Sequence, residues 1–305
     1  MQFVREHYFN TGPVGVQPIA KGEENQNYLI STDSERYVLR LYSLKHSTTG
    51  PRRRQDIDFE LDFIDFADRR DVPTPRVIPT LCGEKIAQAH VDGQKRFAAL
   101  FAFAGGEEAA AYNGRNARST ARLLGKMRGA SLTYRYRAVR AWPGDIIQLS
   151  LDFYQQHRQR VAKYHGVLDN LYQQAAIGYA AVQNERLPRG IIHGDIKLGN
   201  LFFEGDEVTA VLDFDDYRES YLLEEVTRTL LHDLDSPARN AVRSGCYNVF
   251  HEALENDPTI TAAELAHLKT FMRALLVYDI TTYLIHDHHR LADEVLEDEH
   301  IAEVI

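Results

Sequence analysis

The chain has 305 residues, 44% of them hydrophobic and 26% charged, which is typical of a globular protein with one large core or two smaller ones. The formal net charge of -9 argues against nucleic-acid binding, because the basic residues gather in only one short run, Arg52–Arg53–Arg54. Cys82 and Cys246 are the two cysteines and form no CxxC pattern, so we expect neither a disulfide framework nor a structural zinc site.

The sequence has no uninterrupted apolar segment long enough to cross a membrane, and the first residues lack the apolar core of a signal peptide. We therefore expect a cytoplasmic protein without a membrane partner, either a monomer or a homodimer.

Strand patterns dominate the first hundred residues. Residues 27–32 and 36–42 are rich in β-branched and aromatic side chains and are separated by a short polar turn, which predicts a hairpin. Residues 84–91 and 95–104 predict a second strand pair, which ends at Gly105–Gly106.

One helix is expected among these strands, at residues 55–70. Apolar residues recur there every three or four positions, at Ile57, Leu61, Ile64 and Ala67. The aspartates of the same segment are expected to face outward, and they are Asp56, Asp58, Asp62 and Asp65.

After the glycine pair the pattern becomes helical. The expected helical segments are 119–130, 151–183, 221–234, 239–254 and 262–287. The last of them begins with a capping box at Thr261. The organisation is therefore α+β, with a small β-rich lobe at residues 1–104 and a larger, mostly helical lobe at residues 105–305.

Two polar motifs interrupt the helical part. The first, IIHGDIKLGN at residues 191–200, places four polar side chains directly after an apolar run. The second, LDFDD, begins at residue 212, and the intervening residues predict a hairpin around Gly205–Asp206. Such a hairpin brings Asn200 and Asp213 together as oxygen ligands for Mg²⁺. Asp195 is then free to accept a proton from a hydroxyl group.

HGDIKLGN followed by LDFDD resembles the catalytic and metal-binding loops of the aminoglycoside phosphotransferase and choline kinase superfamily. The resemblance implies a bilobal protein-kinase-like fold that uses ATP and Mg²⁺. Gly194 and Asp215 stand where protein kinases have Arg and Gly, which favours the branch that phosphorylates small molecules.

The resemblance also implies a role for each residue of the two motifs. Asp195 would be the catalytic base, and Asn200 and Asp213 would bind Mg²⁺. His193 would order the loop through hydrogen bonds, and Lys197 would lie near the transferred phosphate.

The acceptor site of this superfamily is lined by acidic residues when the acceptor carries an amine. The two substrate-binding residues that we expect are Asp215 and Asp216. Further acidic candidates are Glu219, Glu224, Glu225, Asp279 and Asp287.

The first lobe contains segments that resemble the nucleotide-binding parts of the family. The segment AKGEENQNYLIST, with Gly22 and Asn25, resembles the hairpin that covers the phosphates. The strand that ends at the glycine pair resembles the hinge, where the backbone around Phe101 and Phe103 would bind adenine.

A cation for the nucleotide phosphates is expected from Arg40, where relatives usually have Lys. Its partner would be Glu60, which lies on the apolar side of the expected helix and would be costly to bury without a cation. The alternative is that both side chains are simply solvated.

A histidine-rich run, HDHHR at residues 286–290, suggests a metal site at first sight. Its histidines lack the spacing of a helical zinc pair, so a solvated helix face is the favoured interpretation.

The function expected from these observations is ATP-dependent transfer of the γ-phosphoryl group to a small-molecule hydroxyl. The acceptor would be an amino alcohol, a homoserine-like metabolite or an aminoglycoside. Two alternatives are a bacterial Ser/Thr protein kinase of the same fold and a non-catalytic nucleotide-binding module. The presence of Asp195, Asn200 and Asp213 together argues against the second alternative.

Overall fold

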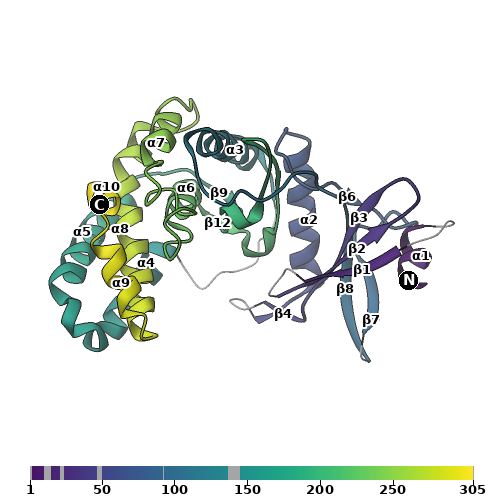
Figure 1. Ribbon diagram of the computed structural model, residues 1–305, viewed down its shortest axis with the longest axis horizontal. Helices are drawn as coiled ribbons and strands as arrows, with labels where there is room; N and C mark the ends of the chain where they lie inside the picture. Colours follow the sequence, from purple (N-terminus) through teal and green to yellow (C-terminus); the bar gives the residue numbers. More distant parts are fainter. Residues whose placement is uncertain are drawn as a thin grey trace. The chain divides into compact units, whose positions relative to one another are not determined.

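The computed structural model describes most of the chain, namely residues 2–9, 15–20, 24–46, 50–91, 93–136 and 145–304. The chain divides into two compact units (Figure 1). The first unit comprises the described residues of 1–105 and 135–142, and the second unit those of 106–134 and 143–305. The expected lobe boundary lies one residue before this division.

An antiparallel sheet forms the first unit, in the strand order β1-β2-β3-β8-β6, with β7 also paired to β8. The strands are β1 (Gly15–Ile19), β2 (Gln26–Ser31), β3 (Arg36–Leu41), β6 (Val77–Ile78), β7 (Ala87–Val91) and β8 (Gln94–Ala102). A short ribbon and two helices complete the described part, namely β4 (Lys45–His46), β5 (Gly50–Pro51), α1 (Gln2–Tyr8) and α2 (Arg54–Asp68). The expected hairpin and the expected second strand pair are both confirmed.

Alternation along β3 explains how this sheet buries one face. Tyr37, Leu39 and Leu41 are buried and join a cluster with Ile30 and Leu100. The side chains between them point to the opposite face of the sheet.

Helix α2 buries the four apolar residues that the sequence predicted. Asp56 differs from the prediction, because it is buried although it was expected to face outward. Its carboxylate accepts a hydrogen bond from the Arg53 backbone amide at 3.0 Å and pairs with the Arg53 guanidinium at 2.7 Å. Asp56 thus satisfies the first turn of the helix instead of facing water.

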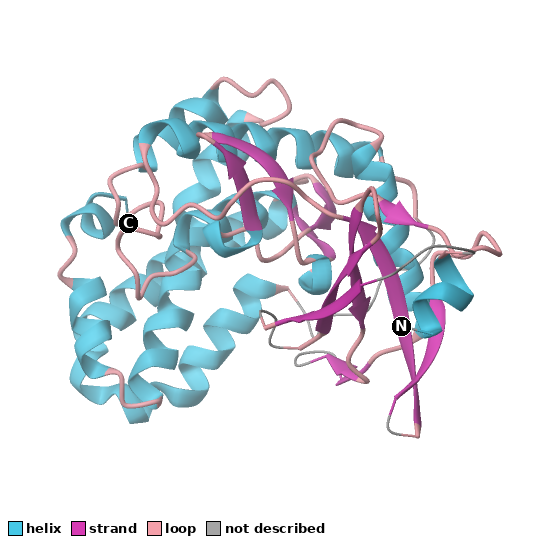
Figure 2. Ribbon diagram, turned by 45° about the vertical axis from the view of Figure 1, so that its right-hand side comes forward, coloured by secondary structure: helices cyan, strands magenta, loops and turns pink. Residues whose placement is uncertain are grey.

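The second unit is mostly helical (Figure 2). Its helices are α3 (Gly114–Thr133), α4 (Ile146–His157), α5 (His165–Asn184), α6 (Leu222–Leu231), α7 (Tyr247–Glu255), α8 (Ala262–Ile285), α9 (His289–Leu296) and α10 (Glu299–Val304). Its strands form two antiparallel pairs, β9 (Arg189–Ile192) with β12 (Arg218–Tyr221) and β10 (Leu201–Glu204) with β11 (Glu207–Val211). Helices α4, α5 and α6 pack against α8.

Two of the predicted helical segments are interrupted. A 3₁₀ helix at Arg158–Tyr164, with non-helical backbone at Val161, separates α4 from α5. The expected helix at 239–254 begins only at Tyr247, because Gly245 turns the chain with φ of 75°. The capping box at Thr261 is confirmed, since its side chain accepts a hydrogen bond from the Glu264 amide.

None of the helices among the described residues combines the length and the apolar character that crossing a lipid bilayer requires.

Candidate active site

Arg40 and Glu60 form an ion pair inside the first unit. The Arg40 Nη1 atom lies 3.5 Å from Glu60 Oε1, and the side chains are 14% and 1% exposed. The Tyr42 hydroxyl also donates to Glu60 Oε1, at 3.0 Å. A buried carboxylate requires such partners. The expected pairing is therefore confirmed, and the alternative of two solvated side chains is wrong.

The other nucleotide-binding candidates of the first unit lie in different surroundings. Gly22 lies outside the described residues. Asn25 is buried, and its Oδ1 atom accepts a hydrogen bond from the Ser43 amide at 2.9 Å. Phe101 is a buried residue of β8, and the Phe103 amide donates to the Arg36 carbonyl at 3.1 Å. An adenine ring bound here would therefore have to use backbone groups other than the Phe103 amide.

In the second unit, the first motif runs from β9 into the β10–β11 hairpin. The hairpin is confirmed, with Leu201 opposite Val211. Beyond its open end the Leu212 amide donates to the Asn200 carbonyl at 2.8 Å, which places Asp213 close to Asn200 along the paired backbones. Asp213 has φ of 64°, a left-handed conformation that Asp tolerates better than most residues, and it turns the chain out of β11.

Asp195 lies at the centre of this loop. Its Oδ2 atom accepts a hydrogen bond from Asn200 Nδ2 at 2.8 Å and lies 3.0 Å from Lys197 Nζ. Its Oδ1 atom lies 3.5 Å from His232 Nε2. Burial lowers the pKa of Lys197, but the Asp195 carboxylate outweighs burial and raises the pKa above its ordinary value. Lys197 and Asn200 thus both contact the Asp195 carboxylate.

His193 is fully buried and makes contacts to backbone groups with both ring nitrogens. Nδ1 lies 3.2 Å from the Asp195 amide, and Nε2 lies 2.9 Å from the Leu212 carbonyl. Nδ1 must therefore accept and Nε2 must donate, which requires a neutral ring with its proton on Nε2. This arrangement ties the loop to the end of β11, as a loop-ordering residue requires.

Glu225 is a functional candidate whose place the sequence did not reveal. Its buried carboxylate accepts hydrogen bonds from the His193 amide and, at 3.1 Å, from the Gly194 amide. Burial raises the pKa of Glu225, and the two amides oppose that rise. Gly194 itself has φ of 84°, and a Cβ atom there would lie 2.2 Å from Arg218 Nη1. The loop therefore requires both a glycine and a buried acceptor behind it.

Glu224 is held in a separate buried network. It accepts hydrogen bonds from Arg218 and Ser220, and from Arg228 Nε at 2.8 Å. Burial raises the pKa of Glu224, but the two guanidinium groups outweigh burial and lower the pKa below its ordinary value. The expectation that Glu224 and Glu225 line the acceptor site is wrong, because both carboxylates bind groups of their own chain. The sequence did contain a signal for this burial, since Glu224 and Glu225 are adjacent acids in the apolar segment LLEEVTRTLL.

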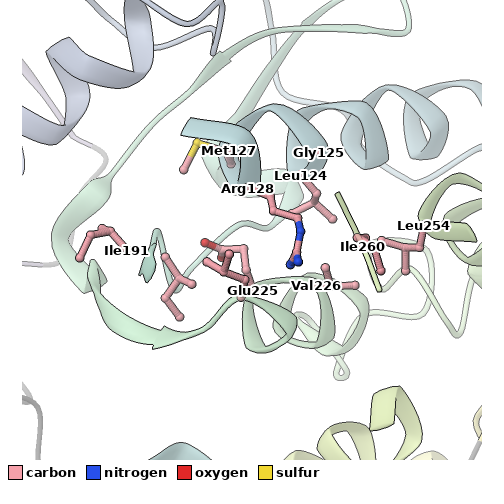
Figure 3. A pocket seen from close by; sticks show the side chains of 11 residues that line it. Leu124, Gly125, Met127, Arg128, Ile191, Glu225, Val226, Leu254 and Ile260 are labelled. Atoms are coloured by element: carbon pink, nitrogen blue, oxygen red, sulfur yellow. The ribbon is translucent and has the colours of Figure 1, made fainter. Parts of the chain in front are cut away.

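A small cavity lies on the α3 side of Glu225. Figure 3 shows Arg128 from α3 and Glu225 and Val226 from α6 among the side chains that line it. Its volume of about 10 Å³ is room for about one water molecule, which is far below the size of a substrate site. Arg128 also pairs with Glu264 at 2.7 Å and donates to the Thr259 carbonyl, so this region is structural.

Asn200 and Asp213 fit the expected divalent metal by the chemistry of their donors. An amide oxygen and a carboxylate are hard ligands, and Mg²⁺ is usually held by one or two carboxylates together with phosphate oxygens. Across the part of the chain that the structure describes, no group of three or more His, Cys, Asp or Glu residues could hold a metal ion. The histidine-rich run is included in that statement, and its His289 stacks on the Tyr164 ring.

The remaining acidic candidates differ in exposure. Asp215 is buried and Asp216 is half-buried, whereas Glu219 is exposed. Asp279 projects from α8, and burial raises its pKa to about 7. Asp287 is 95% exposed.

Comparison with known proteins identifies relatives of this chain. The model of the phosphotransferase enzyme family (APH) matches residues 15–257. Homoserine kinases of Methylobacterium nodulans and Zymomonas mobilis are each 27% identical, over 67% and 66% of this chain. These matches cover 59% of each relative, so the chain spans about three fifths of the length of the curated relatives.

Two solved structures share the fold. An amicoumacin kinase superposes with a TM-score of 0.67 at 15% identity, covering 92% of this chain and 87% of its own. A microcompartment-associated aminopropanol kinase superposes with a TM-score of 0.65 at 17% identity, covering 98% of each chain. The fold is thus the α+β, protein-kinase-like fold that the sequence predicted, and the chain belongs to the phosphotransferase enzyme family.

Proposed function

We propose that the protein transfers the γ-phosphoryl group of ATP to a hydroxyl group of a small molecule. The observation that carries this proposal is the loop geometry around Asp195. One of its carboxylate oxygens, Oδ2, is held by Asn200 and Lys197, and the other, Oδ1, lies 3.5 Å from His232 Nε2. A fixed carboxylate with one available oxygen is suited to position an alcohol and accept its proton.

In the proposed reaction Asp195 accepts the hydroxyl proton while the acceptor oxygen forms a bond to the γ-phosphorus. The bond between this phosphorus and the bridging oxygen breaks, ADP leaves with that electron pair, and Asp195 later returns its proton to solvent. A divalent ion, Mg²⁺ in this proposal, would be held by Asn200 and Asp213 and would neutralise charge on the phosphate oxygens. Lys197 would lie near the transferred group.

Arg40 would bind nucleotide phosphates from the first unit, held in place by Glu60. A guanidinium group offers two parallel donors where an ammonium group offers a point charge, so an Arg40→Lys change is not conservative at this position. Gly22, Asn25, Phe101 and Phe103 stay predicted nucleotide-binding residues.

The acceptor class follows from the relatives. The curated relatives named above are homoserine kinases, and one structural neighbour is an aminopropanol kinase. An alcohol that also carries an amine is common to both substrates. The amicoumacin kinase was solved with AMP-PNP and Ca²⁺, which supports the use of ATP and a divalent ion here. We therefore favour an acceptor that carries both a hydroxyl group and an amine, with Asp215 and Asp216 as the proposed substrate-binding acids.

Asp195→Asn tests this function. The amide cannot accept the hydroxyl proton, so kcat should fall by roughly 10²- to 10⁴-fold, while ATP affinity measured by calorimetry stays within a few-fold of the wild type. Asp152→Asn removes the same charge from an exposed side chain of α4 and should leave kcat unchanged. Near-normal phosphorylation by Asp195→Asn would show that the base is wrongly assigned.

A further inference from the structure

The open side of Asp195 is defined by its contacts. Oδ2 is engaged by Asn200 and Lys197, so an acceptor hydroxyl must approach Oδ1. His232 Nε2 lies 3.5 Å from Oδ1, a separation too long for a good hydrogen bond. His232 Nε2 has no hydrogen-bond partner among the described residues. An acceptor bound at Oδ1 therefore lies beside the C-terminal end of α6.

Helix α6 carries a cation on the same face as His232. The His232 amide donates to the Arg228 carbonyl at 2.8 Å, so the two side chains lie one turn apart on that face. Arg228 also lies close enough to His232 to help burial lower the pKa of its imidazole well below the usual range. The imidazole is therefore neutral, and Arg228 is the charged member of this pair.

The positive charge of Arg228 is not cancelled by its partner. Glu224 is shared between Arg218 and Arg228, so the three side chains together carry a charge of about +1. Only Nε of Arg228 makes a hydrogen bond to a described residue, and its side chain is 22% exposed. The two terminal nitrogens are thus available for a planar anion, and a carboxylate matches their geometry.

Two acidic groups lie near the same cation. Asp279 from α8 and Asp216 both interact electrostatically with Arg228. A site with one guanidinium and two acids near the base suits a ligand that carries both a carboxylate and an ammonium group. It suits a purely cationic amino alcohol less well, because Arg228 would repel it.

We propose that Arg228 binds the carboxylate of the acceptor, so that the enzyme selects an amino acid with a side-chain hydroxyl over the corresponding amino alcohol. This inference rests on the proposed function and specifies the acceptor of the same site.

L-homoserine and 3-aminopropan-1-ol differ only by the carboxylate and therefore test this inference directly. The wild-type enzyme should phosphorylate L-homoserine with a kcat/KM about 10- to 100-fold higher, mainly through KM, as one charged hydrogen-bonded pair provides. In Arg228→Met the ratio of the two kcat/KM values should fall towards one. Arg228→Lys should give an intermediate ratio, because it keeps the charge and loses the paired donors.

Arg290→Met is the matched control. Arg290 also pairs through Nε with a glutamate four positions away, Glu294 at 3.3 Å, and its side chain is 93% exposed. This variant should keep the wild-type ratio. If Arg228→Met does not fold, the wild-type preference and Arg228→Lys decide the question.

A wild-type enzyme without preference for L-homoserine, or an Arg228→Met variant that keeps the full preference, would overturn the role of Arg228. In both cases the proposed phosphotransferase function would stand. If no hydroxyl acceptor were phosphorylated, the proposed function would fall and this inference with it.

Discussion

At the scale of single residues, two carboxyl groups of the second unit have pKa values shifted in opposite directions. Burial raises the pKa of Glu224, but Arg218 and Arg228 outweigh burial and lower it, whereas at Asp279 burial dominates and raises the pKa to about 7. Because of the raised pKa, the contribution of Asp279 to stability depends on pH between the pKa of its carboxyl group in the unfolded chain and the pKa in the folded chain.

The sign of that sensitivity can be tested with Asp279→Asn. Between about pH 4 and pH 7 the folded carboxyl group keeps a proton that the unfolded one has lost, so its contribution to stability is lost as the pH rises. The melting temperature of Asp279→Asn, relative to the wild type, should therefore rise from pH 4.5 to pH 7 and then level off. Asp152→Asn, at an exposed helical position, should show no such trend. A melting-temperature difference between Asp279→Asn and the wild type that does not change across this pH range would contradict the raised pKa of Asp279.

At the scale of elements, α6 contributes most of the support for the loop. Glu225 holds the two amides before Asp195, Glu224 holds Arg228, and His232 follows the last turn. The sequence predicted the helix but not these contacts, because the partner groups come from the loop after β9 and from β12. Those two strands pair with each other across more than twenty residues of intervening chain.

Glu225→Ala tests the support that α6 gives the loop. It leaves the amides of His193 and Gly194 buried without their acceptor, which should cost about 1–3 kcal/mol for each amide in urea unfolding. The turnover number should fall as well, because the backbone that carries Asp195 is no longer fixed. Glu225→Gln keeps one acceptor oxygen, so its stability and turnover number should lie between those of the wild type and those of Glu225→Ala.

Glu204→Gln is the control for this pair of variants, since Glu204 is an exposed residue of strand β10 and has no proposed role. Unchanged stability and turnover in Glu225→Ala would show that the loop does not depend on α6.

Elements that are fixed by local pattern were predictable from the sequence. The hairpin of β2 and β3, helix α2 and the capping box of α8 depend on alternation, periodicity and end signals over a few residues. The burial of Asp56 was not predictable, because Arg53 provides a partner that hydrophobic periodicity does not record. The pairing of Arg40 with Glu60 was predictable, since a glutamate on an apolar helix face demands a cation.

At the scale of the whole molecule, the two compact units are not separated by a single boundary along the chain, because the described residues of 135–142 belong to the first unit. Tyr136 belongs to the first unit and packs edge-on against Phe59, with ring centroids 5.9 Å apart. The sequence around Tyr136 has no apolar period, so only the folded chain reveals this contact. The roles of the two units, one for the nucleotide and one for the acceptor, stay predictions.

The most direct test of the proposed phosphotransferase function follows the phosphoryl group itself. The wild-type protein is incubated with Mg-ATP and hydroxyl-bearing amino acids, amino alcohols or aminoglycosides, and the mixture is followed by ³¹P NMR. A phosphotransferase of this kind should give a new phosphomonoester signal for at least one acceptor, with one ADP formed for each phosphate transferred. ATP that stays unchanged with every acceptor, or phosphate that appears only on protein, would contradict it.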